Sequence, residues 1–229
     1  MNLKAVIFDL FGTLVGDFPS SAREMTKEIA LALAVPCEQF IPLWTQTTEM
    51  RVTGAFDTVE ASIEYVCGVM GAGLEVEQIK RAVEIRLKYT RQALQPRPNA
   101  IDTLSQLKNR GYRIGLISNC SIEIPILWPE TEFAALIESP IFSSKERLRK
   151  PDPSIYRRAC DHLGVLPEQC VYIADGENHE LTAAAEVGLH PVLIRNSIAQ
   201  NRLELFREAR EWQGVTIASL PEVLQLVRR

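Results

Sequence analysis

Short, largely apolar segments rich in β-branched residues are the feature that most constrains the fold of this chain. They occupy residues 4–8, 113–117, 170–174 and 191–194, with a fifth at 215–217. Runs of this length and composition suit strands that are buried on both faces of a parallel sheet. Between them lie segments of helical period, such as Ile101, Leu104 and Leu107 ahead of Gly111. The alternation predicts an α/β fold with an open, Rossmann-like, mostly parallel sheet flanked by helices.

Residues 20–95 break this alternation, because they contain helical patterns and no strand-like run. The helix-start and break signals are Ser20 and Ser21 with Glu24, Phe56-Asp57-Thr58 with Glu60, and Gly71-Ala72-Gly73 before a last helix near residues 75–94. We therefore predict an inserted all-α cap domain over residues 19–95 and a core domain over residues 1–18 and 96–229. An insertion at this point can cover the carboxyl ends of the strands, where open α/β sheets bind ligands.

Composition narrows the class of partner. The chain has 25 Lys plus Arg and 29 Asp plus Glu, and no long run of like charge, which argues against nucleic-acid binding and for a small-molecule substrate. It has no stretch of 18 apolar residues and no signal-peptide pattern at its start, so we expect a cytoplasmic protein with no membrane partner. Its five cysteines form no Cys-x-x-Cys pair, which argues against a disulfide framework or a zinc site.

Polar residues follow two of the predicted strands. Asp9 ends the first apolar run, and Gly12 permits the tight backbone that would expose a carboxylate there, although a turn or cap role suits the same residue. Ser118 and Asn119 end the second run, where they can hold a phosphoryl oxygen or carboxylate, or cap the next helix. Each motif alone is modest evidence of function.

Two further motifs add a cation and a second carboxylate. Lys150 precedes a predicted helix, where a positive charge has no local electrostatic reason unless it neutralises an anion; a surface lysine is the alternative. Asp175 follows another apolar strand, and Glu180 lies at the next helix start, so both can also serve as helix caps. Carboxylate oxygens of Asp9, Asp175 and Glu180 are suited to Mg²⁺ rather than zinc.

In this order, the four motifs resemble those of the haloacid dehalogenase (HAD) superfamily of hydrolases, with Asp9, Ser118, Lys150 and Asp175 matching motifs one to four. The resemblance covers essentially the whole chain and implies a helical cap after motif one. It implies that Asp9 attacks phosphorus or carbon to form a covalent intermediate that water resolves. The predicted site is Asp9, Phe11, Ser118, Asn119 and Lys150 for catalysis, Thr13, Arg51, Ser118, Asn119 and Lys150 for substrate binding, and Asp9, Phe11, Asp175 and Glu180 for Mg²⁺.

Phe11 separates two chemistries within that superfamily. The resemblance to HAD phosphatases places a second Asp, a general acid, where this chain has Phe11, and losing such an acid commonly costs about 10²–10⁴-fold in rate. Phe8 to Thr13 looks more like the motif of 2-haloacid dehalogenases. However, the dehalogenase pattern carries Ser and Asn where Asp175 and Glu177 stand, and an Arg where Thr45 follows Leu43-Trp44.

We weigh the acidic fourth motif and the missing Arg above Phe11, since the backbone carbonyl of residue 11 can still bind Mg²⁺. The favoured prediction is Mg²⁺-dependent hydrolysis of a small phosphorylated or otherwise anionic metabolite. Dehalogenation through an Asp9 ester and a catalytically weak binding or regulatory protein are the alternatives. In the cap, Arg51 either meets an anionic substrate or is a solvated helix-end residue, and Trp44 and Phe56 are expected to be core aromatics.

Overall fold

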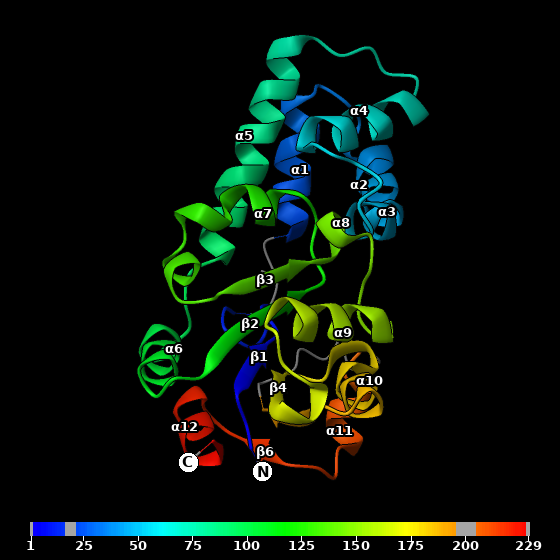
Figure 1. The fold of residues 1–229 in the computed structure, drawn as a ribbon. Coiled ribbons are helices and arrows are strands. Elements are labelled where there is room, and N and C mark those ends of the chain that lie inside the picture. The colour runs from blue at the N-terminus through cyan, green and yellow to red at the C-terminus, as the bar shows by residue number, and fades with distance from the viewer. Residues whose placement is uncertain (1, 17–21, 196–204, 228–229) are drawn as a thin grey trace.

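A six-stranded sheet, entirely parallel, forms the centre of the computed structural model, which describes residues 2–16, 22–195 and 205–227 (Figure 1). Its strands are β1 (Ala5–Phe8), β2 (Arg113–Ser118), β3 (Ser139–Phe142), β4 (Cys170–Ala174), β5 (His190–Ile194) and β6 (Thr216–Ile217). Their order across the sheet is β3-β2-β1-β4-β5-β6. The predicted α/β class and parallel sheet are confirmed.

The register of the central strands brings their carboxyl ends together. In β1, Phe8 lies opposite Leu116 of β2 and Ile173 of β4. Asp9 directly follows β1, and Asp175 directly follows β4, so the two carboxylates leave neighbouring strands at the same edge of the sheet. This edge is where a parallel α/β sheet binds its ligands.

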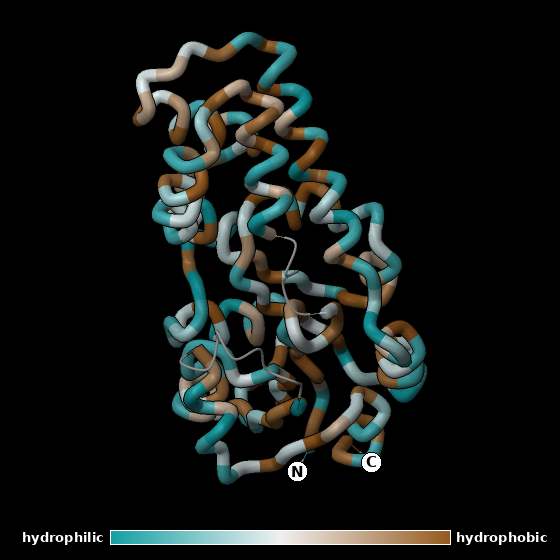
Figure 2. Tube along the Cα trace, turned by 180° about the vertical axis from the view of Figure 1, so that it is seen from behind, coloured by the Kyte–Doolittle hydropathy of each residue, from teal (hydrophilic) through white to brown (hydrophobic). Residues whose placement is uncertain are grey.

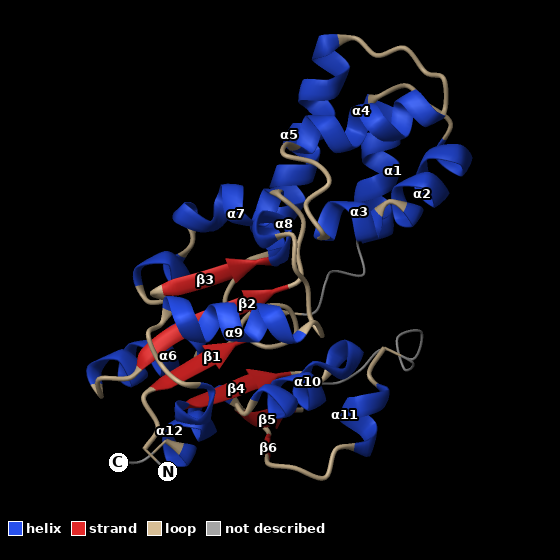
Figure 3. Ribbon diagram, turned by 45° about the vertical axis from the view of Figure 1, so that its right-hand side comes forward, coloured by secondary structure: helices blue, strands red, loops and turns tan. Residues whose placement is uncertain are grey.

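Helices cover both faces of the sheet (Figure 3). They are α6 (Ala100–Asn109), α7 (Glu123–Leu127), α8 (Ser143–Glu146), α9 (Pro153–His162), α10 (Glu180–Val187), α11 (Arg207–Glu211) and α12 (Val223–Leu226). Short 3₁₀ segments lie at Trp128–Glu130, Glu132–Ala135, Pro167–Gln169, Glu177–His179 and Leu220–Glu222. Val6 and Phe8 pack with α6 and α12 on one face, whereas Ala5 and Ile7 pack with α9 and α10 on the other. Side chains that alternate along β1 thus enter two separate cores.

The segment between β1 and β2 carries a helical cap on the carboxyl edge of the sheet. Its helices are α1 (Ala22–Ala32), α2 (Cys37–Gln46), α3 (Thr48–Val52), α4 (Val59–Val69) and α5 (Val76–Ala93). Hydrophobic and hydrophilic residues alternate along them (Figure 2), and their apolar faces form a third core that includes Ile29, Phe40, Trp44 and Ile63. The predicted cap is confirmed, while its boundaries at residues 18/19 and 95/96 stay a prediction.

Most helix-start signals in the cap hold. Thr58 caps α4 by accepting a hydrogen bond from the Ala61 N–H, at 3.0 Å. Glu75 caps α5, which follows the glycine-rich break. The predicted start at Ser20 and Ser21 lies outside the described residues. Trp44 and Phe56 are buried, as predicted.

Strand β3 is the sheet element that the sequence patterns miss. It has four residues and contains Pro140, which lacks the N–H needed for strand pairing on both sides. The structure accommodates it because β3 is an edge strand that pairs only with β2. All five cysteines are free thiols. Within the described ranges, every helix is too short or too polar to cross a bilayer.

Candidate active site

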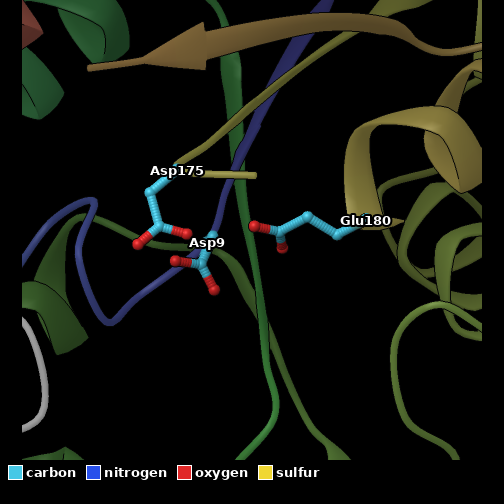
Figure 4. A group of neighbouring side chains, drawn as sticks. All are labelled: Asp9, Asp175 and Glu180. Carbon is cyan, nitrogen blue, oxygen red and sulfur yellow. The ribbon is translucent and has the colours of Figure 1, made fainter. Parts of the chain in front are cut away.

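Three buried carboxylates face one another at the carboxyl edge of the sheet (Figure 4). Asp9 comes from the end of β1, Asp175 from the end of β4, and Glu180 is the first residue of α10. One oxygen of each lies within 4.8 Å of an oxygen of each of the others. The Asp9 N–H donates to the Ile173 carbonyl at 2.9 Å, which ties the backbone of the first strand end to the fourth strand.

Lys150 is the cation of this cluster. Its ammonium donates to Asp9 Oδ1 at 2.5 Å, to Glu180 Oε2 at 2.6 Å and to the Tyr172 hydroxyl at 3.1 Å. These three acceptors match the three donors of an ammonium group. Lys150 is 4% exposed, so the alternative of a surface lysine is wrong. The cation beside the start of α9 neutralises buried carboxylates.

Glu180 has four donors around its two oxygens. Oε1 accepts from the N–H groups of Gly176 and Glu177 at 3.1 and 3.2 Å. Oε2 accepts from Lys150 and, at 2.7 Å, from the Tyr172 hydroxyl. Glu180 therefore fixes both the loop after β4 and the lysine that contacts Asp9. Its role as a direct metal ligand stays a prediction.

Burial and like charge alter the acidities of these groups. Burial raises the pKa of Asp9 to about 7, with Lys150 opposing the rise and Glu180 adding to it. Burial also raises the pKa of Asp175 well above its usual range, and the charges of Glu180 and Asp9 act in the same direction. For Lys150, burial lowers the pKa, but the nearby Asp9 and Glu180 outweigh it and the net shift is upward. With all three carboxylates ionised, the cluster would carry more negative charge than one lysine balances.

A divalent cation fits the excess negative charge of this cluster. Asp9 Oδ2 is a buried oxygen with no hydrogen-bond partner, and it belongs to the residue whose Oδ1 is held by Lys150. Buried polar atoms of this kind call for an explanation, such as an ion. An all-oxygen set suits Mg²⁺, which is bound through one or two carboxylates together with water and substrate phosphate. Asp9 and Asp175 are the residues that would hold it.

Ser118 and Asn119, which form the second motif, differ in their hydrogen bonds. Ser118 is buried at the end of β2, and its Oγ has no hydrogen-bond partner. Asn119 binds the backbone of Lys150 at both ends of its amide: Oδ1 accepts from the Lys150 N–H at 2.8 Å, and Nδ2 donates to the Lys150 carbonyl at 3.0 Å. The geometry gives Asn119 a role in fixing Lys150. Substrate binding by Ser118 and Asn119 stays a prediction.

The remaining residues of motif one occupy different positions. Phe11 lines the cavity in front of Asp9 and packs partly against the core of the sheet. Thr13 is fully buried, its Oγ1 has no hydrogen-bond partner, and it is not among the cavity-lining residues. Metal ligation by the Phe11 backbone and substrate binding by Thr13 therefore stay predictions.

A cavity of about 610 Å³ lies between the carboxylate cluster and the cap. Its core end is lined by Asp9, Asn119, Lys150, Asp175 and Glu180, and its cap end includes Met25, Ile41, Trp44, Arg51 and Arg86. The volume lies within the usual range for small-molecule sites. Arg51 is buried and stacks over the Trp44 ring, 4.0 Å from its centroid, so the alternative of a solvated helix-end residue is wrong.

A buried ion pair between Arg86 and Glu123 also borders this cavity and was missed from the sequence. It joins cap helix α5 to the first residue of α7, and the Ser121 hydroxyl donates to Glu123 at 2.9 Å. Burial raises the pKa of Glu123, but Arg86 outweighs it and keeps that carboxyl below its usual range. The signal for Arg86 is its place on the buried stripe of α5, with Val83 and Thr90 on the same face.

Helix α11 holds the loop after β4 from the side away from the cap. Glu208 accepts hydrogen bonds from the Leu181 and Thr182 N–H groups at 2.9 and 2.7 Å, which satisfies the start of α10. A Cβ added at Gly176, where φ is +80°, would come within 2.9 Å of Ala209. No motif in the sequence indicates that α11 supports Asp175 and Glu180 in this way.

We expect Glu208→Ala to lower the free energy of unfolding by about 1–3 kcal/mol, because the buried N–H of Leu181 and the partly buried N–H of Thr182 lose their acceptor. Urea unfolding measures the loss. Glu211→Ala on the same short helix removes an exposed carboxylate paired with Arg207 and should change stability by less than about 0.5 kcal/mol. Equal losses in the two variants would contradict the capping role of Glu208.

A family model described as haloacid dehalogenase-like hydrolase matches residues 3–188 of this chain. The chain belongs to this family. The match runs from β1 through the cap to α10, and the matched region contains Asp9, Lys150 and Asp175.

Relatives of this HAD-like hydrolase carry out two chemistries. The (S)-2-haloacid dehalogenase 4A of Burkholderia cepacia is 25% identical over 199 residues, which cover 84% of this chain and 83% of the relative. The glyceraldehyde 3-phosphate phosphatase of Methanothermobacter thermautotrophicus is 27% identical over 136 residues, 58% of each chain. A HAD family enzyme of Bacteroides thetaiotaomicron, solved with magnesium and inorganic phosphate, has a TM-score of 0.66 at 19% identity, covering 88% of this chain and 98% of that one.

Proposed function

We propose that this HAD-like hydrolase cleaves small phosphorylated metabolites with Mg²⁺, through a phospho-aspartyl intermediate on Asp9. The observation that carries the proposal is the buried carboxylate cluster of Asp9, Asp175 and Glu180 with an unpartnered oxygen on Asp9. Without a cation, two further carboxylates beside Asp9 would repel any anionic substrate. The relative from Bacteroides thetaiotaomicron holds magnesium and phosphate together, which supports the same pairing here.

The residues around Asp9 have separate tasks in this reaction. Lys150 holds Oδ1 of Asp9 at 2.5 Å, which fixes the carboxylate, and attack of Asp9 on phosphorus breaks the bond from phosphorus to the leaving group. The hydroxyl of Ser118 would donate to a phosphoryl oxygen, since its Oγ accepts and donates no hydrogen bond among the described residues that meets ordinary geometry. Water then attacks the phosphorus of the aspartyl phosphate and releases phosphate. Mg²⁺, when bound, supplies neutralisation of phosphoryl charge and of the acidic cluster.

Phe11 limits the leaving groups that this site can expel. A phenyl ring cannot donate a proton to a departing alkoxide, and the best substrates therefore have a good leaving group, as acyl phosphates do. Proton donation by the substrate itself or by a cap residue would serve the same end. The site is open to esters but favours substrates that need little acid catalysis.

Phe11→Asp should raise turnover of alkyl phosphomonoesters by about 10²-fold or more if only the acid is missing. Acyl phosphate turnover should change much less, because that leaving group needs no proton. Phe11→Asn provides the matched control, since it introduces a side chain of similar size without an acidic proton. Equal rates for the Asp and Asn variants would contradict the role assigned to residue 11.

Mg²⁺ affinity should weaken as the pH falls through about 7. The ligating carboxylates must be ionised, and burial raises the pKa of Asp9 to about 7, so below that value a proton competes with the metal. The raised pKa of Asp175 acts in the same direction. Calorimetry at about pH 6 and about pH 8 should give a dissociation constant roughly tenfold higher at the lower pH. In Asp9→Asn the Mg²⁺ affinity should depend less steeply on pH. A Mg²⁺ affinity that does not change with pH in the unaltered protein would contradict this prediction.

The proposal is tested by measuring phosphate release from phosphomonoesters and acyl phosphates with Mg²⁺ and with EDTA, beside halide release from 2-haloacids. We expect phosphate release that requires Mg²⁺ and no halide release. Halide release that is independent of Mg²⁺ would replace the proposal with the dehalogenase alternative, to which the relative from Burkholderia cepacia points. Inactivity on both panels would favour a binding or regulatory protein.

A further inference from the structure

Two of the five free cysteines contact each other in the core that lies between the sheet and helices α9 and α10. The Sγ atoms of Cys160 and Cys170 are 3.8 Å apart, and both residues are almost fully buried. Cys160 lies in the last turn of α9, and Cys170 is the first residue of β4. Two oxidisable groups from separate elements are thus already in contact in the folded protein.

The other three cysteines lie in different parts of the molecule. Cys37 and Cys67 belong to the core of the cap, and Cys120 lies in the core on the opposite face of the sheet. The proposed phosphatase reaction uses neither thiol of the Cys160–Cys170 pair, so any chemistry of this pair is separate from that reaction.

The contact between the two sulfurs makes the two thiols chemically unequal. A hydrogen bond from Cys170 lowers the pKa of Cys160, with burial opposing the shift. The same hydrogen bond raises the pKa of Cys170, and burial adds to that rise. Cys160 is therefore the thiol that ionises first, and the thiolate is the form of cysteine that reacts with oxidants.

The pair lies beneath the exposed turn that joins α9 to β4. Residues 163–169 form this turn, and Leu166 within it is 57% exposed. The Leu166 carbonyl oxygen is 3.4 Å from the Cys170 Sγ. Hydrogen peroxide is close to water in size, and local opening of this turn is enough to bring it to the sulfurs without global unfolding.

We propose that Cys160 and Cys170 form a redox-active dithiol, which hydrogen peroxide converts into a reversible disulfide within the folded chain. In the first step the Cys160 thiolate attacks one oxygen of the peroxide. The oxygen–oxygen bond breaks, hydroxide leaves, and Cys160 becomes a sulfenic acid.

The second step closes the disulfide. The Cys170 sulfur attacks the Cys160 sulfur, the sulfur–oxygen bond breaks, and the hydroxide that leaves takes the Cys170 proton to form water. The two thiols are oxidised by two electrons in total, and the peroxide is reduced to two molecules of water. The sulfurs need to approach only from 3.8 Å to the usual disulfide bond length of about 2.05 Å.

The disulfide would join α9 and β4 at the edge of the sheet opposite the active site. Asp175 follows the carboxyl end of β4, whereas Cys170 is at its amino end. Lys150 precedes α9, whereas Cys160 is near its last residue. The link constrains the unfolded chain, and the melting temperature should therefore rise by about 2–8 °C on oxidation. The inference does not rest on the proposed phosphatase function.

The test maps the disulfide directly. The folded protein is treated with hydrogen peroxide, its remaining thiols are blocked with N-ethylmaleimide in denaturant, and the chain is digested without reductant for mass spectrometry. Glu168 is the only Glu between the two cysteines, so a Glu-specific protease separates them unless a disulfide joins them. We expect the peptides of Cys160 and Cys170 to be joined, with the blocking group on the other three cysteines. Dithiothreitol should restore both thiols and the original melting temperature.

Cys160→Ala and Cys170→Ala should each abolish the link. Cys67→Ala is the matched control, because Cys67 is a buried cysteine of the cap core and its loss should leave the link intact. If a variant fails to fold, the result for the unaltered protein decides alone. The proposal is overturned if the two thiols stay free, if they are oxidised to sulfinic acid without a link, or if the link forms only in urea. Equal linkage of other cysteine pairs, or a linked protein whose melting temperature is no higher than that of the reduced protein, would also overturn it.

Discussion

Replacing Asp9 with Asn should reduce turnover of every accepted substrate by about 10⁴-fold or more, because the amide is a poor nucleophile and no other carboxylate can take its place in line with the cavity. Glu180 is held by four donors, and Asp175 leaves a different strand. Steady-state phosphate release measures the loss. The loss should appear in kcat for acyl phosphates and for alkyl esters alike, since both require the covalent step.

Asp161→Asn is the control for this substitution. Asp161 lies on α9, is exposed and is outside the cavity, so the same chemical change there should leave turnover within about twofold. A variant of Asp9 that kept more than a tenth of the activity would show that Asp9 is not the nucleophile.

Lys150→Met should lower the free energy of unfolding by about 3–5 kcal/mol, because Asp9 and Glu180 would be left as buried charges without their cation. The loss should be larger at alkaline pH. At low pH the two carboxylates can be protonated, which removes the unpaired buried charge. At high pH they are either ionised without a cation or kept protonated at a cost in the free energy of folding. Urea unfolding at two pH values measures both effects, and turnover should fall with the loss of the hydrogen bond to Asp9.

Lys145→Met, on α8 in the same region, removes an exposed lysine and should cost less than about 0.5 kcal/mol. A loss for Lys150→Met that matched this control, or one that shrank as the pH rose, would contradict the charge balance described for the cluster.

Five of the six strands were predictable because each is an apolar run bounded by polar residues. Strand β3 was not, since four residues with a proline give no such pattern, and its place depends on pairing with the edge of β2. The cap was predictable from its helical periodicity. Its contact with the core was not, because the Arg86–Glu123 pair joins two segments that no local pattern relates.

The candidate site followed from the strand ends. Parallel strands present their carboxyl ends at one edge, so Asp9 and Asp175 had to be near each other once the sheet was correct. Arg51 was harder to judge, because it lies on α3 while Trp44 lies on α2, and no spacing within one helix relates the two residues. The support from Glu208 depends on α11 returning to the loop after β4, which no spacing in the sequence indicates.

The most direct test of the central claim is to identify the covalent intermediate. The protein is mixed with acetyl phosphate and Mg²⁺, quenched in acid within the first turnover, digested, and analysed by mass spectrometry. We predict a phosphoryl adduct on the peptide that contains Asp9, formed only with Mg²⁺ and absent from Asp9→Asn. Phosphate release with no adduct on that peptide, or an adduct on another residue that persists in Asp9→Asn, would contradict the account.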